Sequence, residues 1–465
     1  MTTALIVGHA CNHCKRRCNQ LLSIGSRAYA TRVSATLLGT PLGWVMWAIP
    51  AFLFLIGFFH RAAPGVIARD LMQAFDATGA TVGSLAATYF YSYAALMIPA
   101  GLLLDAFGAR RVMTLGGAVM GLGTLIMGAA PSAPLLFAGR LLIGAGASVT
   151  YVGTLKNAAA WFPPARFGFL AAVSATVGVL GSLVSTLPLA ALVALVGWRS
   201  ACTGVGVVTL MATAACAAVV RDRPASAGTV PAAPGLSAVL GGAGQVLRNP
   251  HTWPPFLAFF CFYTVVGNQA LWVVPYLRDV YGLGLTQAAF YAMATPLALL
   301  VAGPLTGFAS DRVVGRRKAV CLALSAAQLA LWGVFVGTLG SLSLPALHAL
   351  LFAMGLAGGA FVLVWPIGRE VNPPHLDGVA VAVVNLGGFL GAALTQGPIG
   401  ARLDARWAGA LVDGARRYPV EAYRDAFGVC AVFVAAAVAL CLLMRETRGR
   451  NIYAELRGGV LREPA

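Results

Sequence analysis

The chain has 465 residues, of which 59% are hydrophobic and only 10% are charged, and its mean hydropathy is +0.81. Soluble domains carry roughly 25% charged residues, so this composition excludes an ordinary soluble enzyme or binding domain. The net charge of +17 does not indicate nucleic-acid binding, because the basic residues stand in short runs between apolar stretches. Those apolar stretches recur at the length of about 20 residues that spans a bilayer. We therefore predict an all-α membrane protein.

The first 42 residues are basic and contain three cysteines, Cys11, Cys14 and Cys18. A metal site there would need a fourth ligand, which only His9 or His13 could supply at a credible spacing. We expect residues 1–42 to be a disordered basic cytoplasmic leader without a metal, or the product of a misassigned start codon.

Twelve transmembrane helices follow, six on each side of a linker rich in proline, alanine and glycine. The first six are predicted at 43–68, 81–104, 112–130, 134–157, 168–195 and 200–220. The second six are predicted at 253–277, 288–309, 319–339, 344–367, 378–402 and 425–444. The sequence thus predicts an N-terminal bundle (43–220), a cytoplasmic linker (221–252), a C-terminal bundle (253–444) and a cytoplasmic tail (445–465).

The basic residues predict the orientation of the chain. With both termini in the cytoplasm, most of the 32 lysines and arginines fall on the inner side of the membrane. The connection between the last two helices is an exception, but acidic residues offset its arginines. We predict a multi-pass protein of a bacterial-type inner membrane with both termini inside.

A sequence motif occurs twice, after the second and after the eighth predicted helix. The residues are Gly101, Asp105, Gly108, Arg110 and Arg111 in the first copy, and Gly307, Asp311, Arg312, Arg316 and Arg317 in the second. Four matched pairs share one offset, because 307−101, 311−105, 316−110 and 317−111 all equal 206. This shared offset indicates duplication of a six-helix unit, as in many transporters.

This motif resembles the signature loop of the major facilitator superfamily. Further matches are Arg140-Leu-Leu-Ile-Gly144-Ala-Gly146 and Trp161-Phe162-Pro163. The resemblance implies two pseudo-symmetric six-helix bundles and a transporter, not an enzyme. It also implies that both motif copies gate the inner side. The first copy departs from the pattern at Ala106, where the family usually has arginine.

The chemistry of the motif is consistent with gating. Asp105 and Asp311 are predicted at cytoplasmic helix ends beside several arginines. A carboxylate there can pair with an arginine or with a helix N-terminus in one conformation and release it in another. The alternative is that the motif only anchors the loop among the lipid headgroups.

Two arginines, Arg61 and Arg140, lie within predicted spans away from the span ends, and no acidic residue does so. Ionisable residues at this depth usually mark a functional site. Arg61 either reaches the outer interface beside His60 or faces a central cavity and binds an anionic group of the solute. In the superfamily, the arginine at the position of Arg140 often pairs with a carboxylate in the first helix, which is missing here. Arg140 therefore either binds substrate or bonds backbone carbonyls.

Aromatic and amide side chains complete the predicted substrate site. The offset of 206 between the repeats makes Gly267 the equivalent of Arg61, and the amides Asn268 and Gln269 follow it. Singly, such residues more often pack helices together. On helices that line the cavity in this superfamily, they suggest a pocket with stacking surfaces and hydrogen bonds. They are Tyr89, Tyr93, Asn268, Gln269, Trp272, Trp365 and Asn385.

We therefore expect a secondary transporter that moves a small organic anion or amino-acid-like metabolite by alternating access. The sequence resembles the organophosphate and organic-anion exchangers and a group of bacterial amino-acid and nucleoside importers. The alternatives are a solute sensor on the same fold and a drug or metabolite efflux carrier. The chain lacks P-loop, HExxH and GxSxG motifs, so we expect neither ATP-driven transport nor catalysis, and no cofactor. The expected partners are the solute, the lipid bilayer and, in a proton-coupled carrier, a proton.

Overall fold

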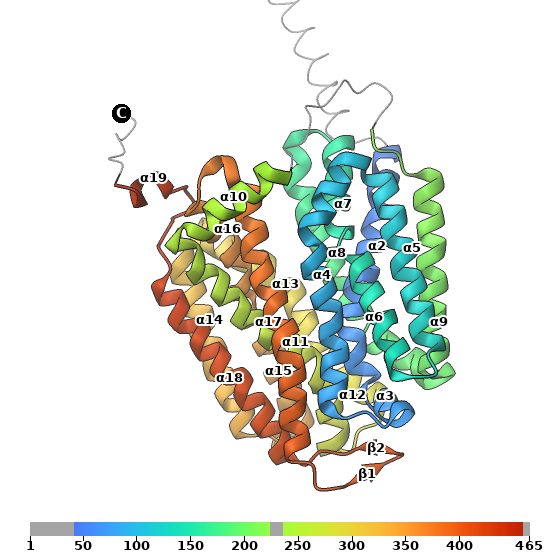
Figure 1. The fold of residues 1–465 in the computed structure, drawn as a ribbon. Helices are drawn as coiled ribbons and strands as arrows, with labels where there is room; N and C mark the ends of the chain where they lie inside the picture. Colours follow the sequence, from blue (N-terminus) through green and yellow to red (C-terminus); the bar gives the residue numbers. More distant parts are fainter. Residues whose placement is uncertain (1–40, 224–235, 459–465) are drawn as a thin grey trace, which may run out of the picture.

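The computed structural model describes residues 41–223 and 236–458. The three leader cysteines and the end of the tail lie outside these ranges. Two helical bundles stand side by side in Figure 1, α2–α9 in blue to green and α11–α18 in yellow-green to red. The linker helix α10 lies at one end of the molecule, which we call the linker end. The β1–β2 hairpin and α3 lie at the opposite end, which we call the hairpin end.

The N-terminal half consists of the elements from α2 to α9. They are α2 (Pro41–Val66), α3 (Ala68–Phe75), α4 (Gly79–Phe107), α5 (Ala109–Ala129), α6 (Ala133–Ala147), α7 (Thr150–Trp161), η1 (Pro164–Arg166), α8 (Phe167–Val184) and α9 (Leu187–Val219).

The C-terminal half follows the linker helix α10 (Leu236–Arg248) and η2 (Pro250–Thr252). Its elements are α11 (Trp253–Val280), α12 (Leu285–Ala292), α13 (Ala294–Phe308), η3 (Ala309–Val313), α14 (Arg317–Gly337), α15 (Leu344–Gly358), η4 (Gly359–Leu363), α16 (Val364–Glu370), η5 (Pro374–Leu376), α17 (Asp377–Ala405), β1 (Leu411–Val412), β2 (Ala415–Arg416) and α18 (Val420–Leu443). The short helix α19 (Tyr453–Leu456) ends the described chain.

Among the described residues, eleven helical segments are long and apolar enough to span a membrane, and one of them, Pro164–Val219, has 56 residues. At 1.5 Å per residue a straight helix of that length would measure roughly 84 Å, more than twice the hydrocarbon thickness. Gly197 interrupts it with φ 77° and ψ 159°. The segment therefore makes two crossings, and the predicted fold of twelve helices in two bundles is confirmed.

Several elements were not predicted from hydropathy. Helix α3 follows α2 after a short break at Ile67 and ends at Asp76, which has a left-handed φ of 47°. The two-stranded hairpin turns at Asp413 and Gly414, whose φ angles are 53° and 76°. An Asp-Gly pair with positive φ at both positions is typical of a two-residue hairpin. These elements cover the hairpin end.

Glycines bring the backbones of the two halves together at the hairpin end. A Cβ atom added to Gly83 in α4 would lie 2.2 Å from the Gln396 carbonyl oxygen in α17. A Cβ atom on Gly400 would lie 2.1 Å from the carbonyl oxygen of Gly79. Small residues permit this kind of close helix packing in membranes.

Polar contacts reinforce the same junction. The Asp404 carboxylate of α17 accepts hydrogen bonds from the Gly79 and Ala80 amides at 2.9 and 2.8 Å, so it caps α4 from the other half. Burial raises the pKa of Tyr418 above its ordinary value, so its hydroxyl stays protonated and donates to Asp404 at 2.7 Å. Arg69 of α3 forms an ion pair of 3.0 Å with the buried Asp279 of α11.

We predict that Gly400→Leu separates the halves at the hairpin end, because the longer side chain has no room against Gly79. The Gly79 and Ala80 amides should then exchange with deuterium roughly tenfold faster or more, since hydrogen bonds to a charged group contribute about 1.5–3 kcal/mol. Hydrogen–deuterium exchange measures this. Gly204→Leu is the control, because a Cβ atom at Gly204 meets nothing within 4 Å. Equal exchange in both variants would contradict the close packing.

Candidate functional site

The guanidinium group of Arg61 lies between the two halves. Its Nη1 atom donates a hydrogen bond of 2.9 Å to the hydroxyl of Tyr263 in α11. Its Nε atom donates one of 3.3 Å to the hydroxyl of Tyr89 in α4. Since these partners belong to different halves, Arg61 links the two bundles and does not extend along the outside of its own bundle.

An aromatic collar surrounds this guanidinium group. Its Cζ atom lies 3.8 Å from the ring centroid of Phe58 and 5.0 Å from those of Tyr93 and Phe389. We define the Arg61 collar as Phe58, Tyr89, Tyr93, Tyr263 and Phe389. The rings of Phe58, Tyr89, Tyr93 and Phe389 make cation–π contacts with it, and such contacts stabilise a desolvated cation by about 2 kcal/mol. The collar therefore holds the charge in place within a mostly apolar environment.

Part of the hydrogen-bonding capacity of Arg61 remains unused. A guanidinium group has five N–H donors, and the described residues accept from Nη1 and Nε only. No carboxylate in the described chain lies within ion-pair distance of Arg61; the nearest ion pair by sequence is that of Arg69. The site thus combines a fixed positive charge with free donors and no negative charge.

Arg140 of α6 lies behind the collar and inside the N-terminal half. Its side chain is fully buried, and its Cζ atom lies 5.1 Å from the ring centroid of Tyr89. None of its three guanidinium nitrogens has a hydrogen-bond partner among the described residues, so the predicted bonds to carbonyls are not formed. Both arginines thus contact Tyr89, Arg140 at its ring and Arg61 at its hydroxyl.

The predicted amides of α11 bond within their own half. Asn268 donates to the carbonyl of Thr264 and to the hydroxyl of Thr395, and Gln269 donates to the hydroxyl of Thr295. Trp272, one turn farther along, is fully buried. The structure does not bring these three residues to Arg61.

Asn385 of α17 does lie between the halves, at a different contact. Its Nδ2 atom lies 3.6 Å from the sulfur atom of Met97 in α4.

Sequence reasoning missed Phe58, Tyr263 and Phe389. Tyr263 is four residues before Gly267, the position that corresponds to Arg61 after the offset of 206 is added. It therefore shares a helix face with the equivalent of Arg61, and that spacing could have identified it. Phe389 likewise follows Asn385 by one turn.

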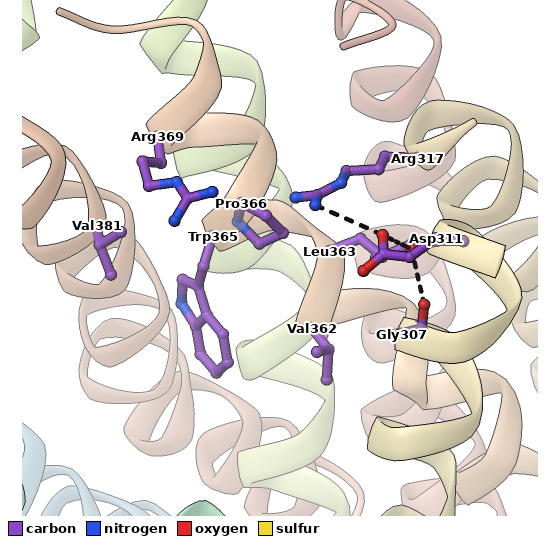
Figure 2. Close-up of a pocket in the computed structure, with 10 residues that line it drawn as sticks. Gly307, Asp311, Arg317, Val362, Leu363, Trp365, Pro366, Arg369 and Val381 are labelled. Carbon is purple, nitrogen blue, oxygen red and sulfur yellow. Dashed lines mark hydrogen bonds and ion pairs between the residues drawn. The ribbon is translucent and has the colours of Figure 1, made fainter. Parts of the chain in front are cut away.

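A cavity of about 460 Å³ lies at the linker end of the C-terminal half. Figure 2 shows the guanidinium groups of Arg317 and Arg369 on one side of it and the Trp365 ring pointing between Val362 and Val381. An aromatic row connects this cavity with the collar. The Trp365 ring lies 5.3 Å from that of Phe259, which lies 5.4 Å from that of Tyr263.

In the first copy of the repeated motif, all of the observed bonds remain within the N-terminal half. Asp105 forms an ion pair of 2.7 Å with Lys156 of α7. Gly108 has a φ of 82°, and the Asp222 carboxylate approaches it so closely that a Cβ atom would lie 2.6 Å away. Asp222 also accepts a bond of 2.7 Å from the Arg110 amide and so caps α5.

The second copy repeats this arrangement in the C-terminal half. Arg317 pairs with Asp311 at 3.5 Å and with Glu370 at 2.8 Å. Glu446 accepts a bond of 2.9 Å from the Arg317 amide and so caps α14. Each capping carboxylate, Asp222 or Glu446, stands three residues beyond the last helix of its half, since α9 ends at Val219 and α18 at Leu443.

The other predicted gating residues make no such contacts in this structure. Gly101 and Gly307 lack a positive φ and have open space around them, so neither position requires glycine. Arg111, Arg312 and Arg316 are exposed and pair with no acidic residue of the described chain.

The profile of the Major Facilitator Superfamily matches residues 50–396. The chain is 26% identical to the probable sulfoacetate transporter SauU of Cupriavidus necator, over 63% of this chain and 69% of that protein. It is 22% identical to the probable galactarate/D-glucarate transporter GarP of Escherichia coli K12 (74% and 84%). It is 24% identical to the membrane sensor protein UhpC of Salmonella typhimurium (79% and 85%).

The fold agrees with this assignment. A bacterial homologue of the human lysosomal transporter Spinster, solved in an inward-facing and unoccupied conformation, superposes with a TM-score of 0.72 at 16% identity. The match covers 92% of this chain and 100% of that one. The profile match over most of the chain establishes that this protein is a multi-pass membrane protein of the major facilitator superfamily of transporters.

Proposed function

We propose that this protein is a secondary transporter of a small organic anion, and that Arg61 binds the anionic group of the solute between the two halves. The observation that carries the proposal is the position of Arg61. Its guanidinium group links both halves, keeps donors free and has no carboxylate partner in the described chain.

Electrostatics gives this position a preference for anions. A positive charge removed from water is costly unless an opposite charge compensates it. The tyrosines of the collar supply neutral oxygens, which compensate only in part. A bound carboxylate or sulfonate could accept the remaining donors in charge-assisted hydrogen bonds. Because the collar already fixes the guanidinium group, binding need not order it again.

The relatives support the same class of solute. Their names assign sulfoacetate to one and galactarate and D-glucarate to another. All three solutes are small organic anions. An amino-acid-like metabolite would offer Arg61 a carboxylate as well, whereas a lipophilic cation would be repelled by it.

We further propose that the two halves alternate access to Arg61, as the duplicated six-helix design favours. In the observed arrangement, glycine contacts and the Asp404 cap join the halves at the hairpin end. At the linker end, the motif copies bond within their own halves. The distribution of basic residues favours a cytoplasmic linker end, so this arrangement corresponds to an inward-facing state.

Replacing Arg61 tests the anion site. We predict that Arg61→Gln abolishes uptake of the solute into proteoliposomes, because the amide lacks the charge. Arg61→Lys should retain only part of it, since lysine cannot match the planar donor geometry. A screen of radiolabelled sulfoacetate, glucarate and related organic anions measures this. Arg424→Gln is the control, because Arg424 is exposed and remote from the collar. Undiminished uptake by Arg61→Gln would refute the proposed site.

A sensor function is the second candidate, because one relative is a membrane sensor protein. A sensor would still bind the anion at Arg61, and a thermal-shift measurement would detect that binding. It would show no counterflow of labelled solute in proteoliposomes, whereas a carrier would.

The gating role of the motif is tested by Asp105→Asn. The ion pair with Lys156 is 2.7 Å long, but its carboxylate side chain is 40% exposed, so we expect a stability loss of at most about 1 kcal/mol. Turnover should fall severalfold while solute affinity stays constant. Asp425→Asn is a matched control, because Asp425 is 39% exposed and pairs with Arg406 at 2.7 Å at the other end of the molecule. A loss of affinity at normal turnover would contradict gating.

A further inference from the structure

A second, smaller cavity lies inside the N-terminal half, behind the Tyr89 ring. Arg140, His60, Thr124 and Cys202 supply its polar lining, and apolar side chains complete it. Its volume is about 20 Å³. A cavity needs roughly 10–15 Å³ to hold one water molecule. This cavity therefore admits an occupant of the size of water or a monatomic ion and excludes a metabolite.

The charge of Arg140 is uncompensated in this cavity. The side chain is fully buried, and none of its guanidinium nitrogens has a hydrogen-bond partner in the described chain. The contact with the Tyr89 ring at 5.1 Å offsets only part of the cost of burying the cation. A buried, unpartnered cation that lines a cavity is a strong indication of an anionic occupant.

The other polar residues of the cavity carry no negative charge. The Thr124 hydroxyl donates to the Met120 carbonyl at 2.7 Å, so it accepts the bond of 3.1 Å from His60. This assigns the His60 proton to Nε2. Cys202 contributes a thiol. The lining thus combines one guanidinium cation with neutral groups.

We propose that this cavity binds a small inorganic anion, preferably chloride, as the counter-ion of Arg140. Chloride has the single charge that Arg140 requires and is only slightly larger than water. Sulfate is larger and carries a second charge, for which the lining holds no further cation. The site is separate from the solute site at Arg61, because Arg140 lines this cavity and Arg61 does not. The proposal therefore stands independently of the proposed function.

The anion would also stabilise the collar, because Arg140 contacts the collar residue Tyr89. Tyr89 contacts Arg140 through its ring and accepts the hydrogen bond of Arg61 through its hydroxyl. An anion that fixes Arg140 would thus fix the ring on which Arg61 depends.

Thermal unfolding of the purified full-length protein tests the proposal. We expect the melting temperature to rise saturably as sodium gluconate is replaced by sodium chloride at constant ionic strength, because a ligand bound only by the folded state stabilises it. Bromide should act like chloride, and sulfate should not. Equal melting temperatures in chloride and gluconate, or an equal effect of sulfate, would overturn the proposal.

Variants locate the ion. Arg140→Gln should weaken chloride binding at least about tenfold in an equilibrium assay with ³⁶Cl⁻, since a charge-assisted bond is lost. If that variant does not fold, Cys202→Leu provides the test, because it fills the cavity and leaves Arg140 in place. Arg61→Gln should bind chloride as the wild type does. Loss of chloride binding in Arg61→Gln alone would assign the ion to the collar and overturn the proposal.

Discussion

The central physical constraint in this protein is a positive charge held between two apolar bundles without a negative partner among the residues that the structure describes. Arg61 is stabilised by two tyrosine hydroxyls and several aromatic rings, which come from both halves. Neutral groups of this kind lower the cost of the buried charge but do not cancel it. The collar therefore keeps the guanidinium group oriented while leaving it able to gain from an anion. This charge lies at the contact between the halves, where it bonds Tyr89 of one half and Tyr263 of the other.

The two ends of the molecule differ in how the halves interact. At the hairpin end, backbone contacts across glycines combine with the buried Arg69–Asp279 pair, whose carboxylate side chain is 1% exposed. At the linker end, the motif carboxylates satisfy partners within their own half. Exposed pairs such as Asp105–Lys156 contribute little to stability. The buried junction, by contrast, joins the two halves directly through close backbone contacts and a buried ion pair.

Hydropathy and the offset of 206 predicted the twelve crossings and the repeated motif, because both depend only on local composition and spacing. Hydropathy did not predict the hairpin, although its Asp413-Gly414 turn is a recognisable signal in the sequence. The collar could be predicted only in part. Arg61, Tyr89 and Tyr93 stand out as polar or aromatic residues in spans, but Tyr263 reaches Arg61 across 202 positions of sequence. Polarity alone also could not tell that the amide of Asn268 faces Thr395 in its own half.

The capping carboxylates Asp222 and Glu446 have a consequence for how the polypeptide is organised. Each one follows the sixth crossing of its half and caps the N-terminus of the third crossing. The segment after the last helix of each bundle therefore bonds back to its own bundle. Neither of these two caps requires the covalent connection between the bundles. A version expressed as two fragments, divided between residues 223 and 236, would keep both caps and the whole interface between the bundles.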